Sequence, residues 1–179
     1  SPTVRIVHRS HRFDQNSIMN YKTKLHGIRL FAFDYDGVFS NGTILLMPDG
    51  AQVRSASVRD GFAVQWAVKQ GLQLALITGG KEPAVSDRMR GLGVQHIHLA
   101  AQDKLAAATE IARSLGIPFN EMAYMGDDMP DLPLLREVGL SACPQDAVPE
   151  VRAEVDYVSP FPGGAGCVRD LLEQYMKLH

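Results

Sequence analysis

The sequence has little of what marks secreted, membrane or nucleic-acid-binding proteins. Its two cysteines, Cys143 and Cys167, are too few for a disulfide framework or a cysteine-based zinc site. No apolar run approaches the roughly 20 residues that span a bilayer, and the first residues lack the layout of a signal peptide. A formal net charge of −2 is not the basic footprint of a nucleic-acid binder. We therefore expect a cytoplasmic protein that binds neither nucleic acid nor a membrane.

What is present is the composition of one folded domain. Of 179 residues, 45% are apolar and 21% charged, and a chain of this length buries roughly two-thirds of its unfolded surface. Disorder is excluded for most of the chain. Residues 1–24 are polar and basic with no sustained helical or strand period. We expect 1–24 to be a solvated extension or tag without a function, and 25–179 to be a single domain.

Short apolar runs alternate with helical patterns after residue 27. The apolar runs are IRLFAFD (28–34), LQLALIT (72–78) and EMAYMGDD (121–128). The helical patterns lie at 62–70, 83–92 and 104–115. This alternation predicts an α/β fold with a doubly wound parallel sheet covered by helices on both faces.

One segment interrupts the alternation. Residues 43–57, TILLMPDGAQVRSAS, form two extended runs around the turn signal Pro48-Asp49-Gly50, which predicts a β-hairpin. Directly after the first strand, this hairpin would hang over that strand's carboxyl end. Phe62 and Trp66 lie at helical spacing, and we expect them in the core.

Acidic residues follow the first and third apolar runs. Because ligands bind beyond the carboxyl ends of parallel strands, polar residues at these positions should meet at one edge of the sheet. Converging carboxylates repel one another unless a cation lies among them, and Mg²⁺ is the usual hard cation where phosphate is handled. A hydroxyl and a lysine ammonium beside such a cation can donate hydrogen bonds to phosphoryl oxygens. The residues at this edge are Asp34, Asp36, Thr78, Gly79, Lys104, Asp127, Asp128 and Asp131.

Each of these residues also has a structural interpretation. An aspartate next to a glycine commonly begins a turn, and Asp127 or Asp128 could cap the next helix. Thr78-Gly79 could be an ordinary loop, and Lys104 a solvated helix residue. Their joint placement at one edge favours a phosphate-handling site.

The motifs FDYDGV, LITGG, Lys104 and GDDMPD occur in the order found in the haloacid dehalogenase superfamily, which the sequence resembles. Most members are Mg²⁺-dependent phosphatases that work through an aspartyl phosphate. The resemblance implies that Asp34 is the nucleophile and that Asp36 protonates the leaving group and then activates water. It also implies that Thr78, the Gly79 amide and Lys104 bind the phosphoryl group.

The same resemblance implies a metal site. Mg²⁺ would be held by Asp34, Asp127 and the backbone carbonyl of Asp36. Asp128 would support these ligands from behind, and Asp131 would orient water or Lys104.

The chain has no room for a large cap domain, only for the hairpin as a flap. Two stretches, SVRDGFAVQWA (57–67) and GGAGCVRDLLEQ (163–174), resemble the capless subfamily of 3-deoxy-D-manno-octulosonate 8-phosphate phosphatases. That resemblance implies a sugar-phosphate substrate and a homotetramer whose glycine-rich tail lies near a neighbouring active site. The implied substrate contacts, besides Asp36, Gly79 and Lys104, are Ser57, Val58, Arg59, Asp60, Gly61 and Arg88.

The chain departs from the subfamily at Gly80, where arginine is usual. Lys81 is a neighbouring candidate to replace it, although an ammonium lacks the bidentate fork. A nine-carbon sugar-acid phosphate, another small phosphate ester or phosphotransfer therefore stays open as the reaction. A phospho-accepting signalling module and a catalytically inactive regulatory subunit are the alternatives from other functional classes.

Overall fold

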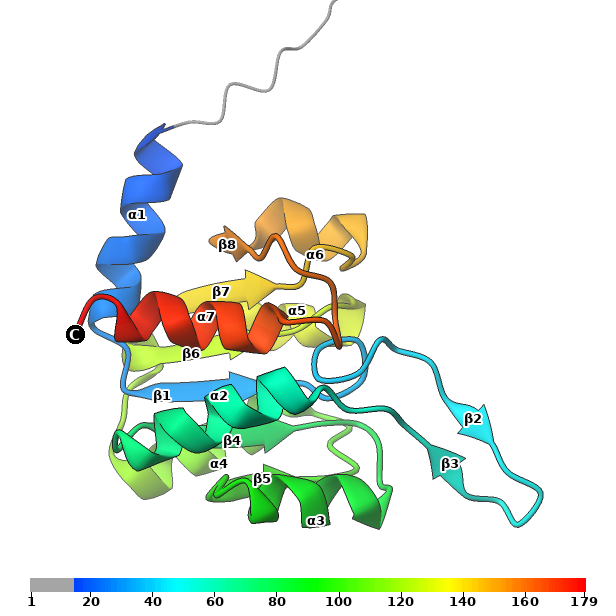
Figure 1. Ribbon diagram of the computed structural model, residues 1–179. Helices are drawn as coiled ribbons and strands as arrows, with labels where there is room; N and C mark the ends of the chain where they lie inside the picture. Colours follow the sequence, from blue (N-terminus) through cyan, green and yellow to red (C-terminus); the bar gives the residue numbers. More distant parts are fainter. Residues whose placement is uncertain (1–14) are drawn as a thin grey trace, which may run out of the picture.

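A parallel six-stranded sheet forms the centre of the protein (Figure 1). The computed structural model describes residues 15–179, with side chains from residue 21 onward. The strand order is β5-β4-β1-β6-β7-β8, and every neighbouring pair is parallel. The strands are β1 (Leu30–Phe33), β4 (Gln73–Ile77), β5 (His96–His98), β6 (Met122–Met125), β7 (Leu140–Cys143) and β8 (Tyr157–Val158).

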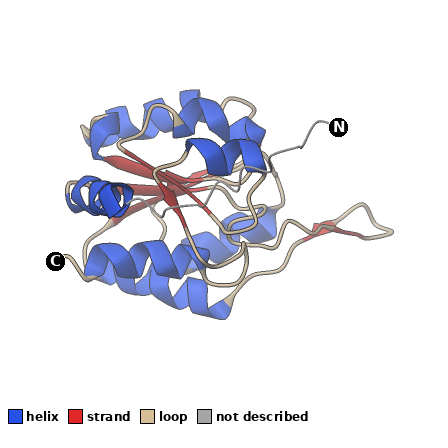
Figure 2. Cartoon of the chain, turned by 90° about the horizontal axis from the view of Figure 1, so that it is seen from above, coloured by secondary structure: helices blue, strands red, loops and turns tan. Residues whose placement is uncertain are grey.

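Helices cover both faces of the sheet (Figure 2). The alternating side chains of β1 show the two layers, because Phe31 and Phe33 belong to one buried cluster and Leu30 and Ala32 to the other. The first cluster is covered by α1 (Gln15–His26), α2 (Val58–Lys69), α3 (Pro83–Gly91) and α7 (Cys167–Met176). The second is covered by α4 (Lys104–Leu115), α5 (Leu132–Leu135) and α6 (Pro149–Glu154). Two short 3₁₀ helices lie at Phe119–Glu121 and Met129–Asp131.

The predicted α/β class and parallel sheet are confirmed. The described residues contain no large cap domain between the first and second motifs or between the second and third. None of the described helices combines the length and apolar character needed to cross a membrane.

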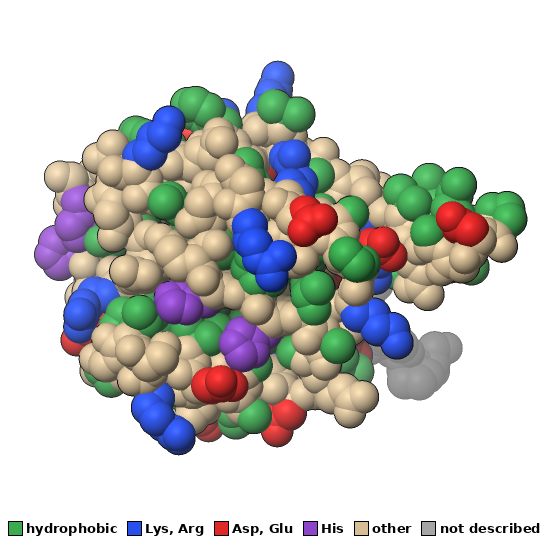
Figure 3. Space-filling view, turned by 90° about the horizontal axis from the view of Figure 1, so that it is seen from below, with side chains coloured by type: hydrophobic (Ala, Val, Ile, Leu, Met, Phe, Trp, Pro, Cys, Tyr) green, Lys and Arg blue, Asp and Glu red, His purple; other side chains and the backbone are tan. Residues whose placement is uncertain are grey.

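The predicted hairpin is also confirmed. Strands β2 (Leu45–Leu46) and β3 (Gln52–Val53) are antiparallel, with Leu45 opposite Val53. The hairpin projects from the body of the molecule, and hydrophobic side chains cover much of it (Figures 1 and 3). Leu45 is 60% exposed and Leu46 78%, so much of this apolar surface of the hairpin stays open to solvent.

The prediction of a solvated tail over residues 1–24 is wrong for its last part. Helix α1 covers residues 15–26, and its end packs on the domain. Leu25 is fully buried, and the Tyr21 ring lies 4.6 Å from that of Tyr157 between centroids. Lys24 forms an ion pair with Asp156 at 2.6 Å. The sequence pattern missed this helix because few of its residues are apolar; residues 1–14 lie outside the described part.

The expectation that Phe62 and Trp66 belong to the core is wrong as well. They are 57% and 40% exposed. The opposite face of α2 packs on the sheet, through Ala63, Val64 and Ala67. Helical spacing therefore identified an apolar stripe correctly but assigned it to the wrong face.

The glycine-rich segment before α7 packs against the loop after β1 of its own chain. A Cβ at Gly163 would lie 2.0 Å from the Gly37 carbonyl oxygen, so only glycine fits there. Asp60, fully buried on α2, accepts hydrogen bonds from the amides of Gly166 (3.3 Å) and Arg169 (3.0 Å). One carboxylate thus joins the start of α2 to the start of α7.

Asp60→Ala should therefore destabilise the fold, because it leaves two amides at the start of α7 without an acceptor. We expect a loss of about 1–3 kcal/mol in the free energy of unfolding, measured by urea denaturation. Asp87→Ala, which removes an exposed carboxylate from α3, is the matched control and should change stability by less than about 0.5 kcal/mol. Equal effects of the two substitutions would contradict the assigned role of Asp60.

Candidate active site

The loops that follow β1, β4 and β6 meet at the carboxyl edge of the sheet and line an open cavity of about 530 Å³. Eight of the predicted catalytic, metal-binding and supporting residues line it, from Asp34 to Asp131. They come from four separate segments of the sequence. The full lining is Asp34, Asp36, Gly42, Thr78, Gly79, Gly80, Ala101, Gln102, Lys104, Asp127, Asp128, Pro130 and Asp131.

Asp34 occupies the centre of this edge because it follows the central strand. Its amide donates to the Met125 carbonyl of β6 (3.0 Å), which extends the sheet pairing by one residue. The carboxylate is buried, accepts from the Tyr35 amide (2.7 Å), and lies 2.9 Å from the Lys104 ammonium. These contacts leave little freedom for the Asp34 side chain, as a positioned nucleophile requires.

Asp131 holds Lys104 and the loop after β6 in place. One oxygen accepts from the Lys104 ammonium (2.7 Å) and the Tyr124 hydroxyl (2.6 Å). The other accepts from the amides of Asp127 (3.0 Å) and Asp128 (3.2 Å). Asp131 is almost fully buried. Of the two roles predicted for Asp131, orienting Lys104 agrees with this contact.

Asp127 completes a group of three carboxylates. Oxygens of Asp34, Asp127 and Asp131 all lie within 4.8 Å of one another. Gly37 permits this approach, because a Cβ there would lie 1.9 Å from Asp127 Oδ2, and its φ of +78° suits glycine. Asp128, by contrast, is exposed and caps the following 3₁₀ helix by accepting from the Met129 amide (2.7 Å).

Crowding of these carboxylates shifts their titration. Burial and then the charge of Asp131 raise the pKa of Asp34 to about 7, against the opposing effect of Lys104. Burial, Asp34 and Asp131 raise the pKa of Asp127 to about 8. Both raised pKa values show that, when these carboxylates are ionised, the positive charge beside them does not balance their negative charge. Carboxylate oxygens at this spacing fit a divalent cation such as Mg²⁺, which would supply that charge.

Thr78 and Gly79 face the same cavity from the end of β4. Thr78 is buried, and its amide donates to the His98 carbonyl of β5 (3.0 Å). Its hydroxyl accepts from the Gly80 amide (3.4 Å). The hydroxyl therefore lies where β4 ends, in the same cavity as the carboxylates.

Sequence reasoning missed Arg54, which follows β3 at the base of the hairpin. Its guanidinium forms a bidentate ion pair with Asp36, from Nε to Oδ1 (2.6 Å) and from Nη2 to Oδ2 (3.2 Å). The Arg54 side chain is only 6% exposed, whereas that of Asp36 is 32% exposed. No motif or periodicity singles out Arg54; only the path of the hairpin brings it to this edge.

The structure does not bring the other predicted substrate contacts into this cavity. Ser57 caps α2 by accepting from the Asp60 amide (3.2 Å). Arg88 donates to the Ser57 carbonyl (3.5 Å), and its Nη2 lies 2.8 Å from the place of a Cβ on Gly61. Val58 is exposed. These residues and Arg59 therefore do not line the catalytic cavity of their own chain, because α2 starts beyond the hairpin.

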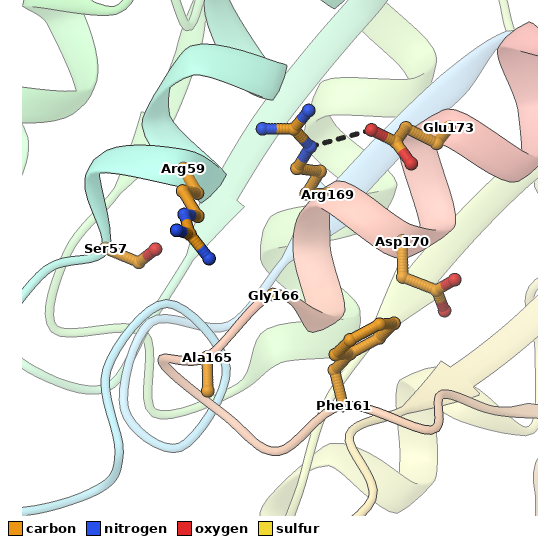
Figure 4. A pocket seen from close by; sticks show the side chains of 8 residues that line it. All are labelled: Ser57, Arg59, Phe161, Ala165, Gly166, Arg169, Asp170 and Glu173. Atoms are coloured by element: carbon orange, nitrogen blue, oxygen red, sulfur yellow. Dashed lines mark hydrogen bonds and ion pairs between the residues drawn. The ribbon is translucent and has the colours of Figure 1, made fainter.

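Ser57 and Arg59 instead line a second cavity of about 540 Å³ between α2 and α7 (Figure 4). Arg59 projects from α2 and Arg169 from α7, where Arg169 pairs with Glu173 at 2.7 Å. The rest of the lining comes from the segment before α7 and from α7 itself: Phe161, Ala165, Gly166 and Asp170.

The raised pKa values predict an unusual pH dependence for metal-free protein. Folded Asp34 and Asp127 keep protons up to about pH 7 and 8, whereas unfolded aspartates lose theirs near about pH 4. The folded state then binds more protons across this window, so its stability falls as pH rises. In EDTA, the melting temperature should fall from pH 5 to pH 8. When Mg²⁺ replaces the EDTA, the melting temperature at pH 8 should rise again.

Asp127→Asn should remove part of this repulsion. We expect it to raise the melting temperature of metal-free protein at pH 8 by roughly 2–8 °C and to abolish the gain from Mg²⁺. Asp87→Asn, on the exposed face of α3, should leave both values unchanged. A melting temperature of metal-free wild-type protein that is constant from pH 5 to 8 would contradict the assignment.

Comparison with known proteins agrees with this geometry. Residues 95–166 match the family of haloacid dehalogenase-like hydrolases. The 3-deoxy-D-manno-octulosonate 8-phosphate phosphatase of Salmonella typhi is 37% identical over 151 residues, which cover 84% of this chain and 80% of that protein. The same enzyme of Escherichia coli K12 is 37% identical over 150 residues, with the same coverage.

Solved structures show the same fold. The 3-deoxy-D-manno-octulosonate 8-phosphate phosphatase of Moraxella catarrhalis, solved with magnesium, phosphate and KDO, superposes with a TM-score of 0.86 and 36% identity, covering 89% of this chain and 91% of that one. The Yersinia pestis phosphatase gives a TM-score of 0.87 and 32% identity, covering 89% and 86%. The chain is therefore a phosphoric monoester hydrolase that belongs to the haloacid dehalogenase superfamily and, within it, to the family of 3-deoxy-D-manno-octulosonate 8-phosphate phosphatases.

Proposed function

We propose that this enzyme hydrolyses 3-deoxy-D-manno-octulosonate 8-phosphate to the free sugar acid and phosphate, in lipopolysaccharide biosynthesis. The observation that carries the chemistry is the arrangement of Asp34, with Lys104 at 2.9 Å, Asp127 beside it and Thr78 in the lining of the same open cavity. The substrate itself is proposed from the identity to relatives with that activity.

Asp34 acts as the nucleophile. A carboxylate oxygen attacks phosphorus and forms an aspartyl phosphate, while the bond from phosphorus to the sugar oxygen breaks. Asp36, two residues on, gives its proton to the leaving alkoxide; Oδ2 can carry this proton once its longer contact with Arg54 Nη2 (3.2 Å) opens. In the second step Asp36 takes a proton from water, whose oxygen attacks phosphorus and releases phosphate with Asp34 restored.

Thr78, the Gly79 amide and Lys104 bind the phosphoryl oxygens. Lys104 reaches them from a fixed position, because Asp34 and Asp131 hold its ammonium at 2.9 Å and 2.7 Å. Because this hydroxyl, amide and ammonium are already in place, they need little reorganisation as negative charge develops on the phosphoryl oxygens in the transition state.

Asp34, Asp127 and the backbone carbonyl of Asp36 are the proposed ligands of Mg²⁺. These residues would hold the ion where it would neutralise charge between the nucleophile and the phosphate. Asp131 supports the site without being a proposed ligand, because both of its oxygens already accept from Lys104, Tyr124 and two amides. Asp128 supports the loop as a cap.

Asp34→Asn should abolish hydrolysis of 3-deoxy-D-manno-octulosonate 8-phosphate while the fold is kept. Losing the nucleophile should lower kcat by at least about 1,000-fold, measured as phosphate release with Mg²⁺ and compared with EDTA-treated wild type. Circular dichroism should be unchanged, and Asp87→Asn should keep full activity. An Asp34→Asn variant with wild-type turnover would refute the nucleophile assignment.

We also propose that the protein is cytoplasmic and that it assembles as a homotetramer. Two features support the assembly: the exposed apolar hairpin, with Leu45, Leu46 and Met47, and the open catalytic cavity, which has no cap in the described part of the chain. We propose that the second cavity, with Arg59 and the glycine-rich segment 163–166, faces a neighbouring subunit's active site and contacts its substrate.

Subunit complementation tests the shared site. Asp34→Asn and Arg59→Ala chains carrying different tags are co-expressed, and oligomers carrying both tags are purified. In random mixtures about a quarter of the sites combine an intact Asp34 with an intact neighbouring Arg59, so activity should return to about that fraction. Mixed oligomers no more active than the average of the single variants would refute the proposal.

A further inference from the structure

The catalytic cavity has too little positive charge for a substrate with two anionic groups. Its lining contains five aspartates and one cation, Lys104. The Lys104 ammonium already contacts two carboxylates, Asp34 and Asp131. Lys104 and the proposed Mg²⁺ both serve the phosphate, so the carboxylate that the proposed substrate also carries has no cationic side chain of its own in this lining.

Arg54 does not line this cavity itself, but its guanidinium reaches two residues that do. Its guanidinium contacts Asp36 and comes within 3.0 Å, at Nη2, of the place that a Cβ on Gly80 would occupy. Asp36 and Gly80 both line the cavity. A Cβ at position 80 would therefore require the guanidinium to move by a few tenths of an ångström. Any larger residue at position 80 would meet the guanidinium, with Cζ at 3.4 Å from the Cβ.

The guanidinium of Arg54 still has donors for a ligand. Nε and Nη2 each donate to Asp36, and Nη1 donates to the Gln52 carbonyl (3.0 Å). Contacts with the described residues thus use three of its five N–H groups, which leaves two. The charge of Glu82 behind the hairpin helps to raise the pKa of Arg54, after the larger effect of Asp36.

We propose that Arg54 binds the carboxylate of the sugar-acid substrate and so sets the specificity of this enzyme, with Gly80 as the residue that admits it. This inference rests on the proposed function. It also explains how the chain can lack an arginine at position 80, since Arg54 places a guanidinium beside that position. Lys81 is exposed, whereas the Arg54 guanidinium contacts Asp36 and lies beside Gly80, so Arg54 is the better candidate to replace the missing arginine.

The test compares a carboxylate-bearing and a carboxylate-free substrate. We would measure kcat and KM for 3-deoxy-D-manno-octulosonate 8-phosphate and for arabinose 5-phosphate, with wild type, Arg54→Gln and Arg54→Lys. Arg54→Gln should lower the ratio of the two kcat/KM values by roughly 10- to 100-fold, mainly through KM for the acid. Arg54→Lys should lower it less, because it keeps the charge and loses the fork.

Two further variants make the result specific. Arg90→Gln, which removes a largely exposed arginine from α3, should leave the ratio unchanged. Arg54→Ala combined with Gly80→Arg should restore most of the ratio, because the new guanidinium enters the vacated space.

The outcomes separate this inference from the proposed function. Equal losses on both substrates in Arg54→Gln would show that Arg54 only holds Asp36, and would overturn the inference while the proposed function stands. A wild-type enzyme without preference for the acid would overturn the proposed substrate, and with it the role of Arg54.

Discussion

Repulsion among buried carboxylates at the end of the central strand is the constraint on which the site depends. Oxygens of Asp34, Asp127 and Asp131 lie within 4.8 Å of one another, and Lys104 forms ion pairs with two of the three, Asp34 and Asp131. Burial and mutual repulsion raise the pKa values of Asp34 and Asp127. This crowding lowers the stability of the metal-free protein. It also favours binding of a divalent ion, because the ion supplies the positive charge that balances the carboxylates.

The fold brings these groups together through close backbone packing. Gly37 lets Asp127 approach the loop after β1, and Gly126 does the same for Asp131, since a Cβ there would lie 2.4 Å from Asp131 Cγ. Gly163, before α7, packs on the Gly37 carbonyl. The carboxyl-terminal segment thus supports the catalytic loop from behind, and Asp60 fixes that segment to α2.

The sequence predicted the parts of the site that depend on local rules. Asp34, Thr78 and Asp127 were predictable because strands that end in turns deliver their next residues to one edge of a parallel sheet. Arg54 was not, because its position depends on the tertiary path of the hairpin and on the space above Gly80.

Residues 57–61 were assigned to the substrate site by resemblance, yet α2 carries them away from the cavity of their own chain. The helix over 15–26 was missed because its few packing residues, such as Leu25, gave no apolar period.

The central claim is that Asp34 carries the phosphoryl group during turnover. Its most direct test is acid quench of the enzyme with substrate and Mg²⁺, followed by borohydride reduction and peptide mass spectrometry. Borohydride converts an aspartyl phosphate into homoserine, so the account predicts homoserine at position 34, dependent on both substrate and Mg²⁺. Reduction at another aspartate, or phosphate release with no reduced residue at all, would contradict it.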